Sequence, residues 1–424
     1  VANDVPAFKP EPYMTSVNDY IAKINFELSF IKYPNQPIKK IMGSWSDINK
    51  TMSENENFAA QITGNGFLKK TVEEISGNMV SEEEKIAAIT NYVKQNIAWD
   101  GHERVYSSQF RKVLESKKGN SADINLLLGS MLEKAGIAVK PVLLSTRSNG
   151  LLRIAAPVVS QFNYVICLAK AGDKTYLLDA TERLLPIGML PQRCLNGKGF
   201  AVSKDGFEWV SLDTKMKTKS VTSVVFDLDP AGELTGTLKV DCNGYEALRN
   251  RKKYLLDGEA EYLKDFIGSH AWNVTSTTIE NAKEIHSNFT QKHELVVNEN
   301  MIVAGDVIYI DPFIYSGQKE NPFKSEVRNY PVDFGSPMED TFYLKLTLPD
   351  GYAIDELPES KIIAMPENAA RYIYNVGLAG NVLTVTSMFH INKGMFTQLE
   401  YPYLREFYNQ IVAKQAEQIV LKKK

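Results

Sequence analysis

One serine in this sequence stands where protein chemistry would place a nucleophile. Ser121 follows Gly119 and Asn120 and opens a leucine-rich segment that ends at Gly136. Gly119 and Asn120 break the preceding segment, and Asp123 is a carboxylate of the kind favoured in a helix's first turn. Because a helix N-terminus presents unpaired backbone N–H groups and the positive end of the helix dipole, a thiolate at this position would be activated. In this chain the side chain carries a hydroxyl.

Only one of the five histidines is a candidate base for that hydroxyl. His102 follows Trp99 in the loop expected before the Ser121 helix and could approach the site, although an exposed loop histidine is the simpler interpretation. The other four lie in the C-terminal half without the i, i+4 spacing or carboxylate neighbours of a metal site: His270, His286, His293 and His390. The sequence predicts no metal ion and no other cofactor.

The three cysteines do not form a recognisable site either. Cys167, Cys194 and Cys242 are widely spaced, odd in number and outside any CxxC arrangement. Neither a zinc site nor a disulfide framework is indicated, and at most one bridge could form. Each is interpreted first as a small buried residue.

Composition excludes two classes of partner. The 424 residues carry a net charge of −3, and no basic stripe is interleaved with aromatic residues, so nucleic acid is not expected as a partner. No run of about 18 apolar residues is present, so no membrane span is expected. The first residues lack the basic and apolar regions of a signal peptide. Because the chain opens with Val1, a leader or an upstream β-domain is expected to be missing from it.

Cap signals and periodicity predict helices followed by a small sheet. Ser44 and Ser81 each open a helix, and the second runs at helical spacing to Trp99. Strands are predicted at 139–145, 162–169 and 175–178. Ahead of them, Ile24, Phe26, Leu28 and Phe30 alternate with polar residues, which is typical of a half-buried strand. That strand needs a partner, for which we favour a β-domain upstream of residue 1.

The C-terminal half is predicted to be rich in strands. A polar, lysine-rich boundary lies at 213–219, and a hairpin turns around residues 229–232. Residues 244–269 have a helical pattern in which Arg249 to Lys253 form a solvated face. Alternating runs at 272–281, 289–298, 301–311, 340–348, 370–377 and 380–391 favour a β-sandwich. A last helix is predicted from 397 to 421.

Residues 80–195 resemble the core of the transglutaminase-like superfamily, which shares a papain-like Cys-His-Asp arrangement. In that family a helix opens with G-x-C and a D and ends in G-I, the next strand carries the His, and the following strand ends in D-x-T. The matching positions here are Gly119-Asn120-Ser121, Asp123, Gly136-Ile137, Phe162 to Ile166, and Leu178-Asp179-Ala180-Thr181. The resemblance therefore places Ser121 at the nucleophile position, Tyr164 at the histidine position, with Asn163 one step away, and Asp179 at the aspartate position.

The flanking residues resemble a bacterial branch in which this core is joined to β-sandwich domains. Ser44-Trp45, Gly244 to Arg249 and Arg328 to Asp333 are among the short matching stretches. The resemblance implies an α+β fold, with a papain/transglutaminase-like core of helices and a small antiparallel sheet followed by an all-β, sandwich-like domain with a C-terminal helix. It also implies export to the periplasm. The expected divisions are 1–40 (linker and strand of an upstream or neighbouring β-domain), 41–213 (core) and 214–424 (C-terminal sandwich).

The substituted triad predicts that the core is not a catalyst. A serine without a base is a weaker nucleophile than a thiol, and tyrosine, with a reference pKa of about 10, is a poor base at pH 7. Asp179 is then expected to bond Tyr164 or backbone, and Ser121 to cap its helix. We expect a binding module for a peptide, protein or glycan. Its cleft is expected to be bordered by Trp99, His102, Asn120, Asp123 and Asn163.

Two other classes of function stay open. One is a protease-like or transglutaminase-like hydrolase or acyl transferase that uses Ser121 with an unidentified base, such as His102 or a group from another chain. The other is a purely structural link between an upstream domain and the C-terminal sandwich. A His102 ring far from Ser121 Oγ would argue against the first.

Overall fold

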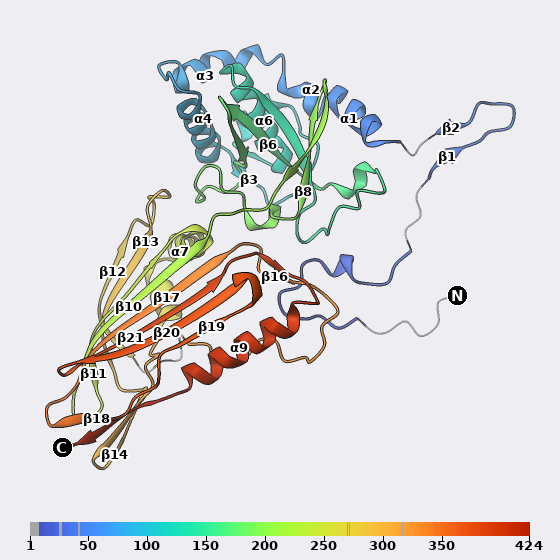
Figure 1. The fold of residues 1–424 in the computed structure, drawn as a ribbon. Coiled ribbons are helices and arrows are strands. Elements are labelled where there is room, and N and C mark those ends of the chain that lie inside the picture. The colour runs from blue at the N-terminus through green and yellow to red at the C-terminus, as the bar shows by residue number, and fades with distance from the viewer. Residues whose placement is uncertain (1–7, 25–27, 41–42, 269, 271, 316) are drawn as a thin grey trace. The chain divides into compact units, whose positions relative to one another are not determined.

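The computed structural model describes residues 8–24, 28–40, 43–268, 270, 272–315 and 317–424 (Figure 1). The chain forms two compact units. Unit 1 contains residues 1–10 and 15–214, and unit 2 contains residues 11–14 and 215–424. No helix in the described ranges is long and apolar enough to cross a membrane.

The six α-helices of unit 1 come before its sheet in the described chain. They are α1 (Trp45–Glu54), α2 (Ala59–Ile62), α3 (Lys69–Ser76), α4 (Glu82–Asn96), α5 (Phe110–Ser116) and α6 (Ser121–Lys134), with 3-10 turns η1 (Val17–Asp19), η2 (Gly66–Leu68), η3 (Val159–Gln161) and η4 (Gln192–Cys194). Ser44 and Ser81 cap α1 and α4 through capping boxes with Asp47 and Glu84, as their sequence signals predict. Gly136 ends α6 with a φ of 82°, a backbone conformation that glycine adopts without steric cost.

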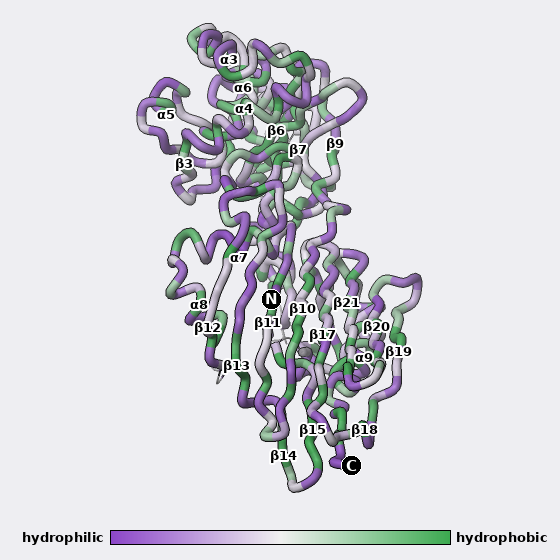
Figure 2. The backbone as a smooth tube through the Cα atoms, turned by 90° about the vertical axis from the view of Figure 1, so that its left-hand side faces the viewer, coloured by the Kyte–Doolittle hydropathy of each residue, from purple (hydrophilic) through white to green (hydrophobic). Residues whose placement is uncertain are grey.

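The sheet of unit 1 is antiparallel and has the order β7-β6-β5-β8-β9. Its strands are β5 (Val139–Leu144), β6 (Tyr164–Ala171), β7 (Lys174–Leu178), β8 (Lys198–Ser203) and β9 (Gly206–Ser211); the short pairs β1 (Phe30–Ile31) with β2 (Lys39–Lys40) and β3 (Ala98–Trp99) with β4 (Lys118–Gly119) lie outside it. The side chains of α6 from Ser121 to Leu132 are all buried, and β6 is hydrophobic along most of its length (Figure 2). The element that carries Ser121 is therefore the centre of the core.

Unit 2 is built on an eight-stranded sheet of order β12-β13-β11-β10-β17-β21-β20-β19. Its strands are β10 (Thr218–Leu228), β11 (Leu234–Cys242), β12 (Trp272–Glu280), β13 (Phe289–Val297), β17 (Met338–Thr347), β19 (Lys361–Ala364), β20 (Ala370–Ala379) and β21 (Val382–Ile391). Neighbours are antiparallel except for β10 and β17, which are parallel. The predicted hairpin at 229–232 joins β10 to β11.

A smaller sheet and a helix complete unit 2. The sheet has the order β14 (Met301–Ala304), β15 (Val307–Ile310), β23 (Ile419–Lys423), β18 (Tyr352–Glu356), and the other elements are α7 (Gly244–Asp257), α8 (Glu259–Ile267), η5 (Pro366–Asn368), α9 (Tyr401–Gln415) and the pair β16 (Val332–Asp333) with β22 (Met395–Phe396). Leu346 of the large sheet, Ile308 of the small sheet and Leu404 of α9 belong to one hydrophobic core. Mixed helices and strands, with a strand-rich second half and a late helix, agree with the predicted fold class.

Two local predictions for unit 2 are wrong. The last helix ends at Gln415 rather than 421, because Ile419 and Leu421 are buried at the two-residue spacing of strand β23, which pairs with β15. Arg251, assigned to a solvated face, is 2% exposed and donates to the carbonyl oxygens of residues 281, 284 and 287. Its long side chain reaches acceptors that no helical pattern reveals.

The half-buried strand predicted from the alternation between Ile24 and Phe30 is also wrong where the chain is described. Only Phe30 and Ile31 are in a strand, and Ile24, Leu28 and Phe30 are all exposed. Phe26 lies outside the described residues. These apolar side chains are not covered by a larger sheet, because β1 pairs only with the two-residue strand β2.

Candidate functional site

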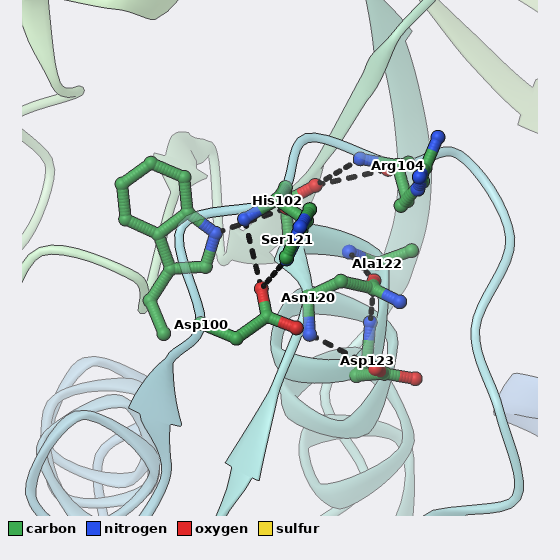
Figure 3. Close-up of polar contacts among 8 residues, drawn as sticks. Asp100, His102, Arg104, Asn120, Ser121, Ala122 and Asp123 are labelled. Carbon is green, nitrogen blue, oxygen red and sulfur yellow. Dashed lines mark hydrogen bonds and ion pairs between the residues drawn. The ribbon is translucent and has the colours of Figure 1, made fainter.

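Asn120, not Ser121, caps helix α6. Asn120 Oδ1 accepts the N–H groups of Ala122 and Asp123 at 2.8 and 2.9 Å, and Asp123 Oδ2 accepts the Asn120 N–H at 2.9 Å (Figure 3). The prediction that Ser121 caps the helix is therefore wrong. The pairing needs a carboxylate three residues after the cap, and Asp123 has that spacing from Asn120. Ser121 is the first helical residue, with its side chain free to point elsewhere.

The Ser121 hydroxyl is held by the backbone of Arg104. Ser121 is fully buried, its Oγ donates to the Arg104 carbonyl at 2.9 Å, and the Arg104 N–H donates to Oγ at 2.8 Å (Figure 3). The Ser121 N–H donates to the His102 carbonyl at 3.1 Å. Both the hydroxyl proton and the backbone donor of this residue are thus engaged within the chain.

His102 contacts Ser121 through its backbone rather than its ring. The His102 side chain is 66% exposed, and Nδ1 lies 3.3 Å from Asp100 Oδ1. Its carbonyl accepts from Ser121 and also from Trp99 Nε1 at 3.1 Å. Between these two described residues, no hydrogen bond joins the imidazole to Ser121 Oγ. The candidate base of the sequence analysis is therefore not paired with the hydroxyl.

Tyr164 and Asp179 are brought together by strands β6 and β7. Tyr164 is the first residue of β6, Asp179 follows β7 directly, and the Tyr164 hydroxyl donates to Asp179 Oδ2 at 2.8 Å. Asp179 Oδ1 accepts the Thr181 N–H at 2.7 Å and the Thr181 hydroxyl at 2.6 Å. Burial, and then the charge of Asp179, raise the pKa of Tyr164 well above its usual range. Tyr164 is consequently a neutral hydrogen-bond donor and not a base.

Asn163, the neighbouring candidate, belongs to a second polar cluster. Its Nδ2 donates to Glu103 Oε2 at 2.6 Å and to Thr146 Oγ1 at 2.8 Å, and its Oδ1 accepts the Thr146 N–H at 2.9 Å. Thr146 Oγ1 also donates to Glu103 Oε2 at 3.0 Å. Asn163 therefore joins the end of β5 to the loop before α6, and its contacts are with groups other than Asp179.

An arginine without any sequence signal lies at this site. Arg193 Nη2, from η4, donates to the Tyr164 hydroxyl at 3.1 Å and to Thr181 Oγ1, while its guanidinium lies over the Trp99 ring, with Cζ 4.2 Å from the ring centroid. Next to it, Cys194 Sγ lies 3.6 Å from Asp179 Oδ2, and burial raises the pKa of that thiol. No motif or spacing in the sequence associates residues 193–194 with the triad positions.

Lys94 is a second cation that sequence reasoning missed. It is 2% exposed, comes from α4, and donates from Nζ to the Leu185 carbonyl at 2.8 Å. Burial lowers its pKa, and the charges of Asp179 and Glu182 oppose that shift. The helical spacing of α4 predicts apolar residues on its buried face. No sequence signal indicates that the ammonium group of Lys94 is buried as well.

The remaining predicted residue, Asp123, has a structural role. Beyond the capping box, its Oδ1 accepts the N–H and the hydroxyl of Ser108 at 2.6 and 2.8 Å. Among the residues described, no group of three or more His, Cys, Asp or Glu side chains could hold a metal ion. All three cysteines are free and buried.

Comparison with known proteins identifies two regions of the chain. Residues 69–172 match the transglutaminase-like superfamily, and residues 306–421 match a domain family of unknown function with a solved structure, DUF3858. No curated protein matches. Among solved structures, one described as "a putative protease from Parabacteroides distasonis ATCC 8503" is 15% identical with a TM-score of 0.49. The match covers 89% of this chain and 58% of that one.

The first of these matches covers only part of the site, because β7, Asp179 and Arg193 lie beyond residue 172. Residues 69–172 include α4, which carries Lys94, helix α6 with Ser121 at its start, and strand β6 with Tyr164 at its start. The chain therefore contains a transglutaminase-like core.

Proposed function

We propose that the transglutaminase-like core is a non-catalytic module that binds a peptide. The observation that carries the proposal is the state of Ser121, whose hydroxyl both donates to and accepts from the backbone of Arg104. A serine nucleophile needs its proton directed to a base. Here the proton is directed to a carbonyl oxygen, which cannot accept it as a base does.

Stabilisation of a tetrahedral intermediate is also unsupported at this position. Backbone N–H groups next to the nucleophile are the usual donors to a developing oxyanion. The N–H groups of Ser121, Ala122 and Asp123 are already donated to His102 and Asn120. A substrate carbonyl at Ser121 would therefore compete with three existing hydrogen bonds of the protein.

Among the described residues of unit 1, no base is paired with the Ser121 hydroxyl either. His102 is the only histidine in residues 1–214, its ring is turned to Asp100, and Tyr164 is neutral and bonded to Asp179. The alternative function, a serine hydrolase with His102 as base, requires the 100–104 loop to rearrange so that the imidazole replaces the Arg104 backbone at Ser121 Oγ.

A substrate survey tests the proposal. The full chain is incubated with internally quenched peptides that cover all twenty residues at the cleaved position, and with a glutamine peptide plus a fluorescent amine for acyl transfer. Wild-type, Ser121→Ala and His102→Ala proteins are expected to give the same background rate. Hydrolysis or transfer that falls at least tenfold in Ser121→Ala would overturn the proposal, and a parallel fall in His102→Ala would establish the alternative.

A further inference from the structure

The polar groups at the three triad positions are fully used inside the protein. The Ser121 hydroxyl is bonded to Arg104, the Tyr164 hydroxyl donates to Asp179, and Asp179 accepts from Tyr164 and twice from Thr181. A ligand at this place must therefore be recognised by a different side chain. Arg193 is the residue in contact with the triad positions that still has donors to offer.

The guanidinium of Arg193 is fixed in place but only partly used. Its plane lies against the Trp99 ring, and its backbone carbonyl accepts the Arg147 N–H at 2.9 Å. Nη2 makes the two bonds to Tyr164 and Thr181, and Nε is buried without a partner. Within the described residues Nη1 has no hydrogen-bond partner and is not among the buried unpaired atoms. One N–H edge of the group is therefore open.

Arg193 also has no carboxylate in direct contact among the described residues. Asp179 attracts the guanidinium from behind the Tyr164 and Thr181 hydroxyls, and its own oxygens are satisfied by other donors. Glu103 is bonded to Asn163 and Thr146, and the buried Asp179 also attracts the cation Lys94. A half-buried guanidinium without an ion pair is costly, whereas a planar carboxylate matches its N–H fork.

We infer that Arg193, held by Trp99, binds the free C-terminal carboxylate of a peptide ligand. This rests on the proposed function, since it names the chemical group that the same site would recognise. The position of Arg193 beside the triad residues suits this role, because in a hydrolase the new carboxylate of the product lies beside the nucleophile and the base. A cation beside the triad residues favours a peptide that already ends in a carboxylate over a peptide whose amide bond there is intact.

Two pools of peptides test the inference. Acetylated random pentapeptides are prepared with a free C-terminal carboxylate or with a C-terminal amide, and binding to the full chain is measured by equilibrium dialysis and mass spectrometry. The carboxylate pool is expected to be retained about tenfold or more over the amide pool, because a charge-assisted hydrogen bond is lost in the amide. The difference should shrink as salt is raised.

Variants separate recognition from folding. Arg193→Met is expected to abolish the preference, and Arg193→Lys to restore part of it, since a lysine keeps the charge but loses the fork. Arg183→Met, an exposed arginine of the preceding loop, is the matched control and should bind as the wild type does. Far-UV circular dichroism and melting of each variant confirm folding.

Each outcome is informative. Equal retention of the two pools, retention of neither, or a wild-type preference in folded Arg193→Met would overturn the inference. Retention of neither pool would also count against the proposed binding of peptides, whereas the other two results would leave that proposal in place. The proposal that the core is non-catalytic fails only if a peptide is cleaved or transferred in a Ser121-dependent way. The same samples are analysed for cleavage products, so the two failures are distinguishable.

Discussion

The Tyr164 hydroxyl donates a 2.8 Å hydrogen bond to Asp179 Oδ2, and both side chains are buried in unit 1. The bond links the first residue of β6 to the residue that follows β7, so it joins the two strands at one end. The same hydroxyl accepts from Arg193 Nη2 at 3.1 Å. A tyrosine at this position thus serves as a neutral bridge between a buried carboxylate and a half-buried guanidinium.

Removing that bridge should destabilise unit 1. In Tyr164→Phe, Asp179 Oδ2 loses its strongest donor and Arg193 Nη2 loses an acceptor, which we expect to cost about 1–3 kcal/mol of unfolding free energy. Urea unfolding followed by tryptophan fluorescence measures it, since Trp45, Trp99 and Trp209 all lie in unit 1. Tyr176→Phe, which removes a longer 3.3 Å bond to Glu83, is the control. Equal effects of the two changes would contradict the bridging role.

A thiol at the nucleophile position should remain unreactive. Ser121 has no exposed surface, so we expect Ser121→Cys to resist iodoacetamide in the native state, as the three buried native cysteines should. Intact mass counts the alkylated thiols before and after denaturation in urea. Ser46→Cys, on an exposed position of α1, is the reactive control. Alkylation at position 121 as fast as at position 46 would show that the site is open and weaken the proposed function.

Unit 2 should lose stability as the pH falls from 6.5 to 4. His293 is fully buried, with Nδ1 3.0 Å from Thr277 Oγ1 and Nε2 3.1 Å from Gln291 Oε1, and burial lowers its pKa to about 4. The unfolded chain takes up a proton below about pH 6.5, whereas the folded chain keeps the imidazole neutral. Over this window His293 alone should therefore remove about 2–3 kcal/mol of unfolding free energy, with no further loss below it.

Urea titrations at pH 4, 5, 6 and 7, followed by circular dichroism, measure this slope. His293→Gln is expected to flatten it, whereas His286→Gln, at an exposed residue, should leave the slope as in the wild type. A wild-type slope in folded His293→Gln would refute the assignment.

The segment 11–14 should be coupled to unit 2 through Arg328. The side chain of this arginine is 2% exposed, donates to the Pro12 carbonyl at 2.6 Å, and pairs with Glu11 Oε2 at 3.3 Å. We expect Arg328→Met to cost about 3–5 kcal/mol of unfolding free energy, because it removes the hydrogen bond to the Pro12 carbonyl and leaves the partly buried Glu11 carboxylate without its cation. Glu11→Gln should cost less. In a double-mutant cycle the two changes are expected to couple by about 1–3 kcal/mol, and strictly additive losses would count against the pair.

The sequence by itself determined the elements whose signals are local. The capping boxes at Ser44 and Ser81, the glycine end of α6 at Gly136 and the hairpin between β10 and β11 each depend on residues within a few positions of one another. The same locality explains the errors. Asn120 and Ser121 are both good caps, and the hydrogen bond that the Asn120 N–H donates to Asp123 Oδ2 decides between them. Ile419 and Leu421 fit either a helix or a strand until β15 pairs with them.

Only the tertiary structure decided what surrounds the triad positions. Arg104 meets Ser121 from 17 residues away, and Arg193 meets Tyr164 from 29 residues away. Such contacts are set by how α6, the sheet and the loops pack, and no periodicity or spacing encodes them. The sequence could place a serine, a tyrosine and an aspartate at the three positions. Packing alone decided that the serine is bonded to backbone. Packing also decided that an arginine presents an open N–H edge beside the tyrosine.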